Sequence, residues 1–222
     1  MSSALGRPRL HFRVADSTNE RAKQLARAGA AHGTLVTAAE QSAGRGRQGR
    51  AWTAPPGSAV LMSLVVREPS EILPLAAAVA VCDSCAELPC RIKWPNDVWI
   101  ERRKLAGILV EGRPQEGWAV LGIGLNVASA PADLPATHLR EHEPDATTDG
   151  ALEGLLAALE RRLRAPSAEI LEEWRARDAL LGQKVRWDGG EGTAAGIDHS
   201  GALLVDTGGE RLALNAGEVH LR

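Results

Sequence analysis

The segment best suited to bind a charged ligand is residues 44–50, which read Gly-Arg-Gly-Arg-Gln-Gly-Arg. Glycine lets a backbone turn its N–H groups toward a ligand, and each guanidinium offers a planar fork that matches a carboxylate or a phosphate. The fixed glycine spacings of the P-loop and of the dinucleotide fingerprint are absent. A solvated turn is therefore the alternative, and the neighbouring motifs must decide whether this segment is an anion-binding loop.

Three further clusters place polar residues beside short strand-like runs. They are Lys93-Trp94-Pro95-Asn96-Asp97, Lys104-Leu105-Ala106-Gly107-Ile108-Leu109-Val110-Glu111 and Gly122-Ile123-Gly124-Leu125-Asn126. Only four of the 26 basic residues are lysines, and Lys93 and Lys104 are two of them. A compact ammonium can follow charge that moves between oxygens during a reaction. Chance retention of a surface lysine is the alternative for each position.

The composition fits one globular domain with a small appendage, or two modest domains. The chain has 222 residues with 44% hydrophobic content and a formal net charge of −2. The arginines of residues 44–50 are therefore a local feature, which favours a small anionic ligand over nucleic acid. No secretory signal opens the chain, and its longest apolar run, Leu73 to Cys82, is too short to span a bilayer. We expect a cytoplasmic protein.

The cysteines and histidines give no metal-site spacing. Cys82, Cys85 and Cys90 are odd in number, which fits reduced thiols, and no fourth ligand lies near them. We interpret them as small buried side chains, with Cys82 and Cys85 on one face of an alanine-rich helix. The six histidines are scattered, and His138 and His142 are expected in a polar loop. We interpret the histidines as structural or surface residues.

The hydrophobic pattern predicts an α+β fold with two parts. A helix should run from Ser17, which has capping-box spacing to Glu20, to about Gly29. Other helices are expected at 74–88, 148–164 and 167–179, and strands at 34–39, 59–67, 91–93, 98–100, 105–111 and 118–123, the last four as a meander. Residues 128–150 should form a loop. Beyond Gly182, short β runs predict a small barrel of about five strands, with a domain boundary near residue 181.

Five motifs, in one order, resemble those of biotin–protein ligases. They are Ser17-Thr18-Asn19, residues 44–50 with Trp52, and the three clusters that contain Lys93, Lys104 and Asn126. The resemblance runs from about residue 10 to the C-terminus. It implies a mixed-sheet catalytic domain of the biotin/lipoate ligase type (1–180) followed by a small SH3-like barrel (181–222). Only some ten residues precede the first motif, so we expect a short form without the N-terminal DNA-binding domain of repressor-type members.

The resemblance implies a two-step reaction with biotin and ATP as substrates and Mg²⁺ as cofactor. Biotin's carboxylate attacks the α-phosphate of ATP to give biotinyl-5′-AMP, and a lysine of a biotin carboxyl carrier protein or domain then takes the biotinyl group. We expect no DNA and no membrane as partners, and the sequence leaves open whether the chain forms a homodimer.

Roles for individual residues also follow from the resemblance. The lysine and arginines implied to act in catalysis are Lys104, Arg45 and Arg47. Biotin would be bound by Ser17, Thr18, Asn19, Gln41, Arg45, Gly46, Arg47, Lys104 and Gly107. ATP and the adenylate would be bound by Arg45, Arg47, Arg50, Trp52, Lys93, Asn96, Lys104 and Asn126. Asp97 is a candidate for the metal, and Trp94 is expected in the core.

Two other functions stay open at this point. A lipoate or octanoate ligase or transferase would share the fold, and the transferases use a cysteine and lysine pair; none of the three cysteines has a matching motif. A non-catalytic biotin-binding sensor would not require Lys104. We also expect the three glycines of residues 44–50 to make this segment a lid that orders when a ligand supplies the anion.

Overall fold

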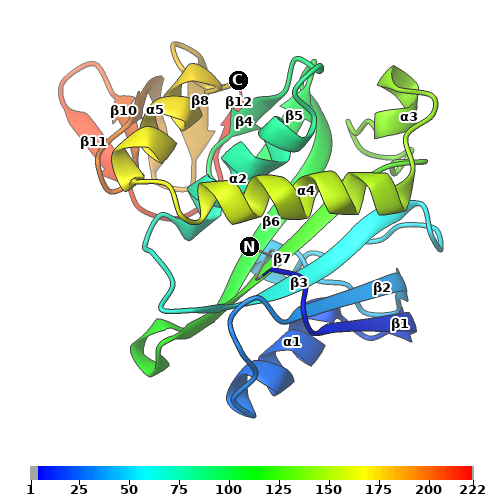
Figure 1. Ribbon diagram of the computed structural model, residues 1–222. Helices are drawn as coiled ribbons and strands as arrows, with labels where there is room; N and C mark the ends of the chain where they lie inside the picture. Colours follow the sequence, from blue (N-terminus) through cyan, green and yellow to red (C-terminus); the bar gives the residue numbers. More distant parts are fainter. Residues whose placement is uncertain (1–4, 222) are drawn as a thin grey trace.

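The computed structural model describes residues 5–221, whose strands form two sheets (Figure 1). The larger sheet has the order β1-β2-β3-β7-β6-β5-β4 and is mixed, because β1 and β2 are parallel and the other pairs are antiparallel. Its strands are β1 (Arg9–Ala15), β2 (Leu35–Gln41), β3 (Ala59–Arg67), β4 (Arg91–Lys93), β5 (Asp97–Ile100), β6 (Arg103–Arg113) and β7 (Trp118–Asn126). The helices are α1 (Thr18–Arg27), α2 (Leu73–Ser84), α3 (Leu139–His142), α4 (Thr148–Arg162) and α5 (Ser167–Ala176).

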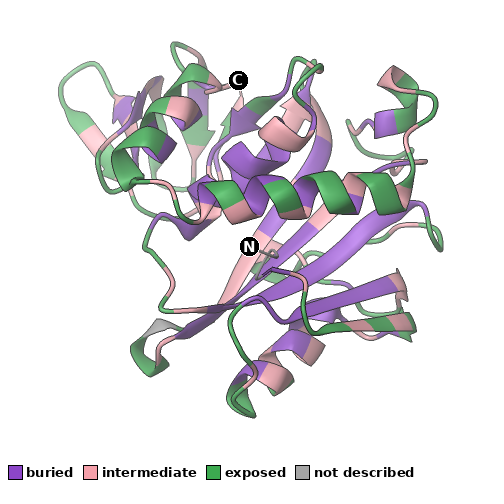
Figure 2. Cartoon of the chain, in the orientation of Figure 1, coloured by how far each residue is buried: buried purple, intermediate pink, exposed green. Residues whose placement is uncertain are grey.

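Helices cover the two faces of this sheet unequally. The helix α2 is buried on almost every side, because it lies between the sheet and α4, whose outer face is exposed (Figures 1 and 2). On the opposite face, α1 packs mainly against β2, β3 and β7. The remainder of that second face, over β6 and the end of β7, is left for other segments to cover.

The alternation of side chains along β7 explains how one strand serves both faces. Leu121, Ile123 and Leu125 belong to the main core, whereas Trp118 and Val120 pack with α1. Further along this second face come Gly122 and Gly124. Since glycine has no side chain, the strand leaves room above itself at these two positions.

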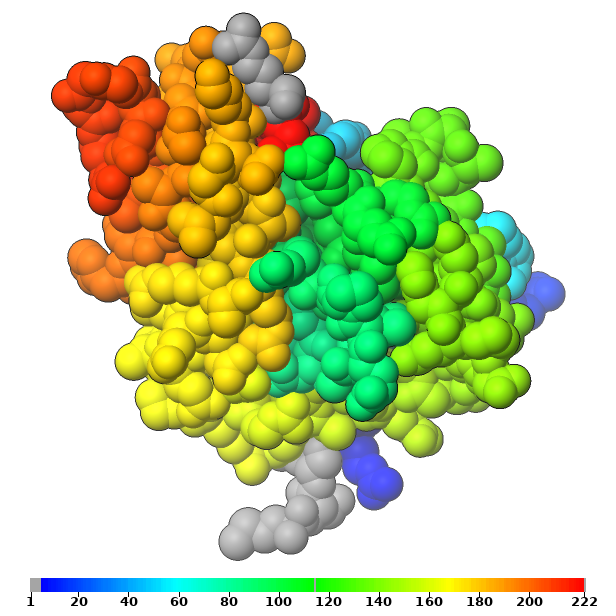
Figure 3. All heavy atoms as spheres, turned by 90° about the horizontal axis from the view of Figure 1, so that it is seen from above, coloured from blue at the N-terminus to red at the C-terminus, as the bar shows by residue number. Residues whose placement is uncertain are grey.

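The smaller sheet is antiparallel, with the order β11-β10-β9-β8-β12. It consists of β8 (Lys184–Trp187), β9 (Gly190–Ile197), β10 (Leu203–Asp206), β11 (Arg211–Leu214) and β12 (His220–Leu221). In Figure 3 its orange and red residues form a lobe in contact with the yellow residues of α5. Trp94, buried beside β4, donates from Nε1 to the carbonyl of Gly201 at 3.1 Å and so ties this lobe to the larger sheet.

Most predicted elements are confirmed, including the meander from β4 to β7 and the five strands of the C-terminal lobe. The helix predicted at 74–88 ends at Ser84, so Cys85 lies beyond it and does not share a helical face with Cys82. Ser17 occupies the N-cap of α1 without a side-chain capping bond, and Glu20 instead pairs with cations. The strand β1 was not predicted, and the predicted loop at 128–150 contains the short helix α3 and the start of α4. Among residues 5–221, no helix has both the length and the apolar character needed to cross a bilayer.

Candidate active site

A cavity lies over β6 and β7, on the sheet face that α1 leaves partly uncovered. It brings together segments that are far apart in the chain: the start of α1, the Gly/Arg loop (residues 44–50), both strands and residues 131–136. Every predicted site residue except Lys93 lines it. These residues are Ser17, Thr18, Asn19, Gln41, Arg45, Gly46, Arg47, Arg50, Trp52, Asn96, Asp97, Lys104, Gly107 and Asn126.

Neutral polar groups line the end of the cavity next to α1. The backbone N–H of Thr18 donates to Gln41 Oε1 at 2.7 Å, and the Thr18 hydroxyl lies 3.1 Å from the same oxygen. Ser63, fully buried on β3, lies 2.8 Å from Thr18 Oγ1. Because Ser17, Thr18 and Gln41 offer both donors and acceptors, this end suits an uncharged polar head group.

Asn19 has both ends of its amide held by the protein. Its oxygen lies 2.6 Å from Ser63 Oγ, and its nitrogen donates to Glu111 Oε2 at 2.8 Å. The side chain rests directly on β7, because a Cβ added at Gly122 would lie 2.1 Å from Asn19 Oδ1. Asn19 therefore shapes the floor of the cavity, and glycine at 122 is required for it to lie there.

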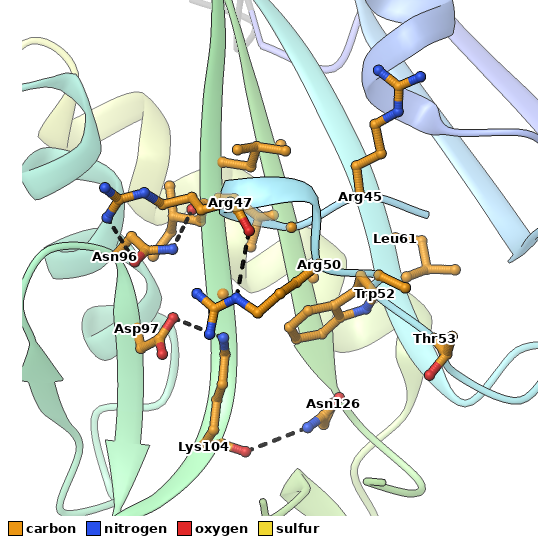
Figure 4. Close-up of a pocket in the computed structure, with 18 of the residues that line it drawn as sticks. Arg45, Arg47, Arg50, Trp52, Thr53, Leu61, Asn96, Asp97, Lys104 and Asn126 are labelled. Atoms are coloured by element: carbon orange, nitrogen blue, oxygen red, sulfur yellow. Dashed lines mark hydrogen bonds and ion pairs between the residues drawn. The ribbon is translucent and has the colours of Figure 1, made fainter. Parts of the chain in front are cut away.

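The Gly/Arg loop is held by residues from two other parts of the chain. Within its single 3₁₀ turn (Arg47–Gly49), Gln48 has a φ of 54°. Arg47 donates to Asn96 Oδ1 at 3.2 Å (Figure 4). It also donates to the carbonyl of Gly217 at 3.1 Å, and Arg50 forms an ion pair with Glu218. The loop is thus fastened to the C-terminal lobe by its second and third arginines.

The first arginine of the loop points elsewhere. The guanidinium of Arg45 pairs with Glu20 of α1, and its side chain is 53% exposed. Figure 4 shows this guanidinium turned away from Lys104. In this conformation the Arg50 guanidinium lies near Lys104 and that of Arg47 lies beside Asn96, whereas Arg45 would have to turn to reach the same ligand.

Lys104 lies at the charged end of the cavity. Its Nζ is 2.8 Å from Asp97 Oδ1 and 5.4 Å from the centroid of the Trp52 ring. The indole lies flat on the sheet, because a Cβ added at Gly124 would come within 2.3 Å of it and one at Gly107 within 2.9 Å. The ammonium is thus held between a carboxylate and an aromatic face, with part of its surface open to the cavity.

Three buried polar atoms of the cavity wall have no hydrogen-bond partner in the protein. They are Trp52 Nε1, Asn126 Oδ1 and Asp97 Oδ1, the last of which faces Lys104 as an ion pair without hydrogen-bond geometry. Buried polar atoms are nearly always satisfied, so unpaired ones in a cavity indicate groups that await a ligand. The Asn126 amide nitrogen already donates to the carbonyl of Thr137 at 3.0 Å, which fixes its oxygen in place.

The charges around the cavity favour an anion. Arg45, Arg47, Arg50 and Lys104 line it, and Asp97 is the one carboxylate among the described lining residues. Burial lowers the pKa of Arg47, opposed by the charge of Asp97, but a guanidinium remains protonated at neutral pH.

Lys93 is not brought to the cavity wall. It is buried, its ammonium lies 5.5 Å from the ring centroid of Trp99, and Trp99 is the residue that lines the cavity. Burial lowers the pKa of Lys93, partly offset by the nearby charges of Asp97 and Glu218. The expected role of Lys93 in binding ATP stays a prediction.

Several lining residues were not predicted. They are Ala51, Thr53, Leu61, Met62, Trp99, Ile108, Leu109, Gly122, Ile123, Gly124, Pro131, Leu134, Pro135 and Ala136. Gly122 and Gly124 were inside a quoted motif, and their alternation with buried residues was a usable signal. No sequence pattern identified residues 131–136 as part of the cavity wall. Their position depends on a tertiary contact, the hydrogen bond from the backbone N–H of Lys104 to the carbonyl of Pro135 at 2.8 Å.

The residues present suit a magnesium ion that arrives with a nucleotide better than a preformed metal site. Within residues 5–221, no group of three or more His, Cys, Asp or Glu side chains is arranged to hold a metal. Mg²⁺ commonly keeps several waters and binds one or two carboxylates together with substrate phosphates. Asp97, with one buried oxygen that accepts no hydrogen bond, fits the part of that single carboxylate.

The three cysteines are buried in the main core, and none of them lines the cavity. Hydrogen bonding to Cys90 and burial raise the pKa of Cys85, and a hydrogen bond with Cys82 is the largest cause that raises the pKa of Cys90 to about 12. Thiols in this state are poor nucleophiles, so the cysteine and lysine pair of an acyl transferase has no counterpart here.

Comparisons with known proteins agree on one family. The model of the biotin/lipoate A/B protein ligase family matches residues 11–127, and that of the biotin protein ligase C terminal domain matches residues 180–222. The chain is 36% identical to the biotin–[acetyl-CoA-carboxylase] ligase of Mycobacterium tuberculosis, covering 94% of this chain and 88% of that protein. The corresponding ligase of Paracoccus denitrificans is also 36% identical, with 92% of this chain and 96% of that protein covered.

Among solved structures, the biotin protein ligase from Aquifex aeolicus in complex with biotin and ATP superposes with a TM-score of 0.86. The two chains are 27% identical, and the match covers 97% of this chain and 99% of the other. The likeness therefore extends over both sheets.

Proposed function

This chain belongs to the biotin/lipoate A/B protein ligase family, and we propose that it is a biotin–protein ligase that activates biotin with ATP and transfers it to a carrier lysine. One observation carries the proposal. A neutral polar pocket at the start of α1 and a cationic end around Lys104 belong to the same cavity. Biotin has that polarity, since its ureido ring is neutral and its far end is a carboxylate.

In the first step, an oxygen of the biotin carboxylate bonds to the α-phosphorus of ATP, and the bond from that phosphorus to the β-phosphate bridge breaks. Biotinyl-5′-AMP forms and pyrophosphate leaves. Two like charges about 4 Å apart repel by about 4 kcal/mol at an effective dielectric near 20. Lys104, Arg47 and Arg50 are placed to offset this repulsion and to stabilise charge that grows on the α-phosphoryl oxygens.

The groups without partners in the cavity suit the nucleotide. Asn126 Oδ1 can accept a hydrogen bond from the nucleotide, Trp52 Nε1 can donate one, and the indole face offers a packing surface. When Mg²⁺ is bound, it neutralises phosphate charge and makes pyrophosphate a better leaving group. Asp97 would be the protein ligand nearest to it, and Lys104 would then exchange its contact with Asp97 for the reacting oxygens.

In the second step, the neutral amine of a lysine on a biotin carboxyl carrier protein or domain attacks the anhydride carbonyl. An amide bond forms, the carbonyl–oxygen bond to AMP breaks, and the amine loses a proton. Opening of the Gly/Arg loop would admit this lysine, whereas its closure would shield the anhydride from water. We further propose that the protein acts in the cytoplasm, where carboxylase carrier domains occur.

Mass spectrometry of the purified protein after incubation with biotin, ATP and magnesium tests this function. We expect biotinyl-5′-AMP, together with pyrophosphate release that depends on biotin. Octanoate and lipoate in place of biotin serve as controls, because the same fold could hold them. An adenylate formed with octanoate or lipoate but not with biotin would contradict the proposal.

A further inference from the structure

A network of charged side chains connects the floor of the cavity to the Gly/Arg loop. Lys23 Nζ lies 3.0 Å from Glu111 Oε1 and 2.6 Å from Glu20 Oε1. Glu111 in turn accepts from Asn19 at 2.8 Å, and Glu20 pairs with Arg45 of the loop. Three segments that are distant in sequence are thereby joined by a single ammonium.

Lys23 has the least exposed side chain of these four charged residues. Its side chain is 12% exposed, against 24% for Glu20, 27% for Glu111 and 53% for Arg45. It lies four residues after Asn19, so the two side chains share one face of α1. Exposed ion pairs usually contribute little, but an ammonium enclosed between two carboxylates fixes both of them.

Lys23 does not itself line the cavity, so any effect on a ligand must pass through its partners. Without its charge, Glu20 of α1 and Glu111 of β6 would lose the ammonium between them, and only Arg45 would balance the two carboxylates. Glu111 would no longer be held against the Asn19 amide, and a net negative charge would stand beside a site for anions.

We propose that Lys23 is a positioning residue for biotin binding, which sets Asn19 through Glu111. This inference rests on the proposed function and adds a residue that touches no substrate. It gives a role to Lys23, the third of the four lysines to be discussed. The ammonium of Lys23 contacts two carboxylates at once, whereas a planar guanidinium has a different geometry.

Titration calorimetry with biotin alone, combined with steady-state assays of ATP, tests the proposal on the full chain. Lys23→Met should raise the Kd for biotin about tenfold, the loss typical of a charge-assisted hydrogen bond, with the KM for ATP changed less than about twofold. Lys23→Arg should recover part of the affinity. Arg27→Met removes the same charge from the exposed last turn of α1 and should leave both constants unchanged.

Equal changes in the two constants, an unchanged Kd for biotin, or the same effect from Arg27→Met would overturn the inference. If Lys23→Met does not fold, as judged by its thermal transition, Glu111→Gln replaces it. The amide keeps an acceptor for Asn19 but loses the charge opposite Lys23, so the Kd for biotin should still rise, and an unchanged value would overturn the inference. Failure of the wild-type protein to form biotinyl-5′-AMP would instead refute the proposed function.

Discussion

The ammonium of Lys104 lies 2.8 Å from Asp97 Oδ1, across the antiparallel pair β5 and β6. The two groups form an ion pair at hydrogen-bond distance, and the Asp97 side chain is 13% exposed. Breaking such a pair is costly unless both charges find other partners. An arriving anion could take the place of Asp97 beside Lys104, and Asp97 would then be free for a cation. The pair therefore links the group that would contact the reacting anions, Lys104, with the group that would contact a bound cation, Asp97.

Replacement of Lys104 by alanine should reduce the first step strongly. We expect the rate of biotin-dependent pyrophosphate release to fall by on the order of 10² or more, because a preorganised cation is lost at the developing charge. Lys104→Arg should restore little, since a planar fork cannot take the place of an ammonium held between Asp97 and Trp52. Thermal unfolding of each variant controls for stability, and an unchanged rate for Lys104→Ala would remove Lys104 from the mechanism.

Alanine substitutions at two glycines of β7 should distinguish the end of the cavity that binds biotin from the end that binds ATP. A Cβ at Gly122 would lie 2.1 Å from Asn19 Oδ1, and one at Gly124 would lie 2.3 Å from the Trp52 indole. Gly122→Ala should therefore weaken biotin binding about tenfold or more by displacing Asn19, since leaving a buried polar group of the ligand without its partner costs about 1–3 kcal/mol. Gly124→Ala should raise the KM for ATP more than the Kd for biotin. Calorimetry and steady-state kinetics would show the contrast, and identical profiles for the two variants would contradict it.

Much of this site could be predicted because its residues lie in short motifs next to strands. The period of two puts Gly107 and Glu111 on one face of β6. Lys104 lies three residues before Gly107, and it reaches the same cavity because the register between β5 and β6 shifts near this point, which the alternation alone does not predict. Lys93, expected to bind ATP, is buried near Trp99 and does not line the cavity, a tertiary relationship that no local pattern reports, and its role stays a prediction. The ion pairs of Arg45 with Glu20 and of Arg50 with Glu218 likewise join segments whose distance in space no local pattern reports.

The contact between the Gly/Arg loop and the C-terminal lobe should restrain the loop. Glu218→Gln removes the ion pair with Arg50, and such a half-exposed pair contributes about 1 kcal/mol, so tryptic cleavage within residues 44–50 should become about fivefold faster. Saturating biotin and ATP should slow cleavage in both proteins. Glu210→Gln, an exposed change in the same lobe, is the control. Cleavage at one rate with and without ligands would count against a lid.

The cysteines should take no part in the reaction. Raising the pKa of Cys90 from 9.0 to about 12 lowers its thiolate fraction at pH 8 by on the order of 10³, and all three cysteines are buried. We expect a disulfide reagent to label the native protein very slowly, without loss of adenylate formation, and to label all three thiols rapidly in urea. Fast labelling coupled to inactivation would instead support a thiol-dependent acyl transfer.

An ion cluster beneath α4 should set part of the pH dependence of stability. Asp83 of α2 is 7% exposed and pairs with Arg162 Nε at 2.6 Å, Arg161 Nη2 at 2.9 Å and Arg177 Nη2 at 3.2 Å. Burial alone would raise the pKa of Asp83, but the hydrogen bonds from Arg162 and Arg161 outweigh it and hold the pKa below its usual value. Asp83 thus joins α2 to α4 and to the end of α5 as a carboxylate.

Asp83→Asn should therefore lower the free energy of unfolding by about 2 kcal/mol at pH 7, because Arg162 loses its charge-assisted hydrogen bond to the buried Asp83 and keeps only the more exposed Glu169 and Glu173 as counterions. A depressed pKa stabilises the folded state at every pH above the unfolded value near 4, and this contribution is lost as the pH falls through the folded pKa. Urea unfolding at pH 7, 5 and 3 should show a difference between wild type and variant that is constant from pH 7 to 5 and smaller at pH 3. Asp206→Asn, which breaks an exposed pair with Arg211, should change stability far less. A difference that did not shrink at pH 3 would mean that the shape of Asp83, and not its charge, stabilises the junction of α2, α4 and α5.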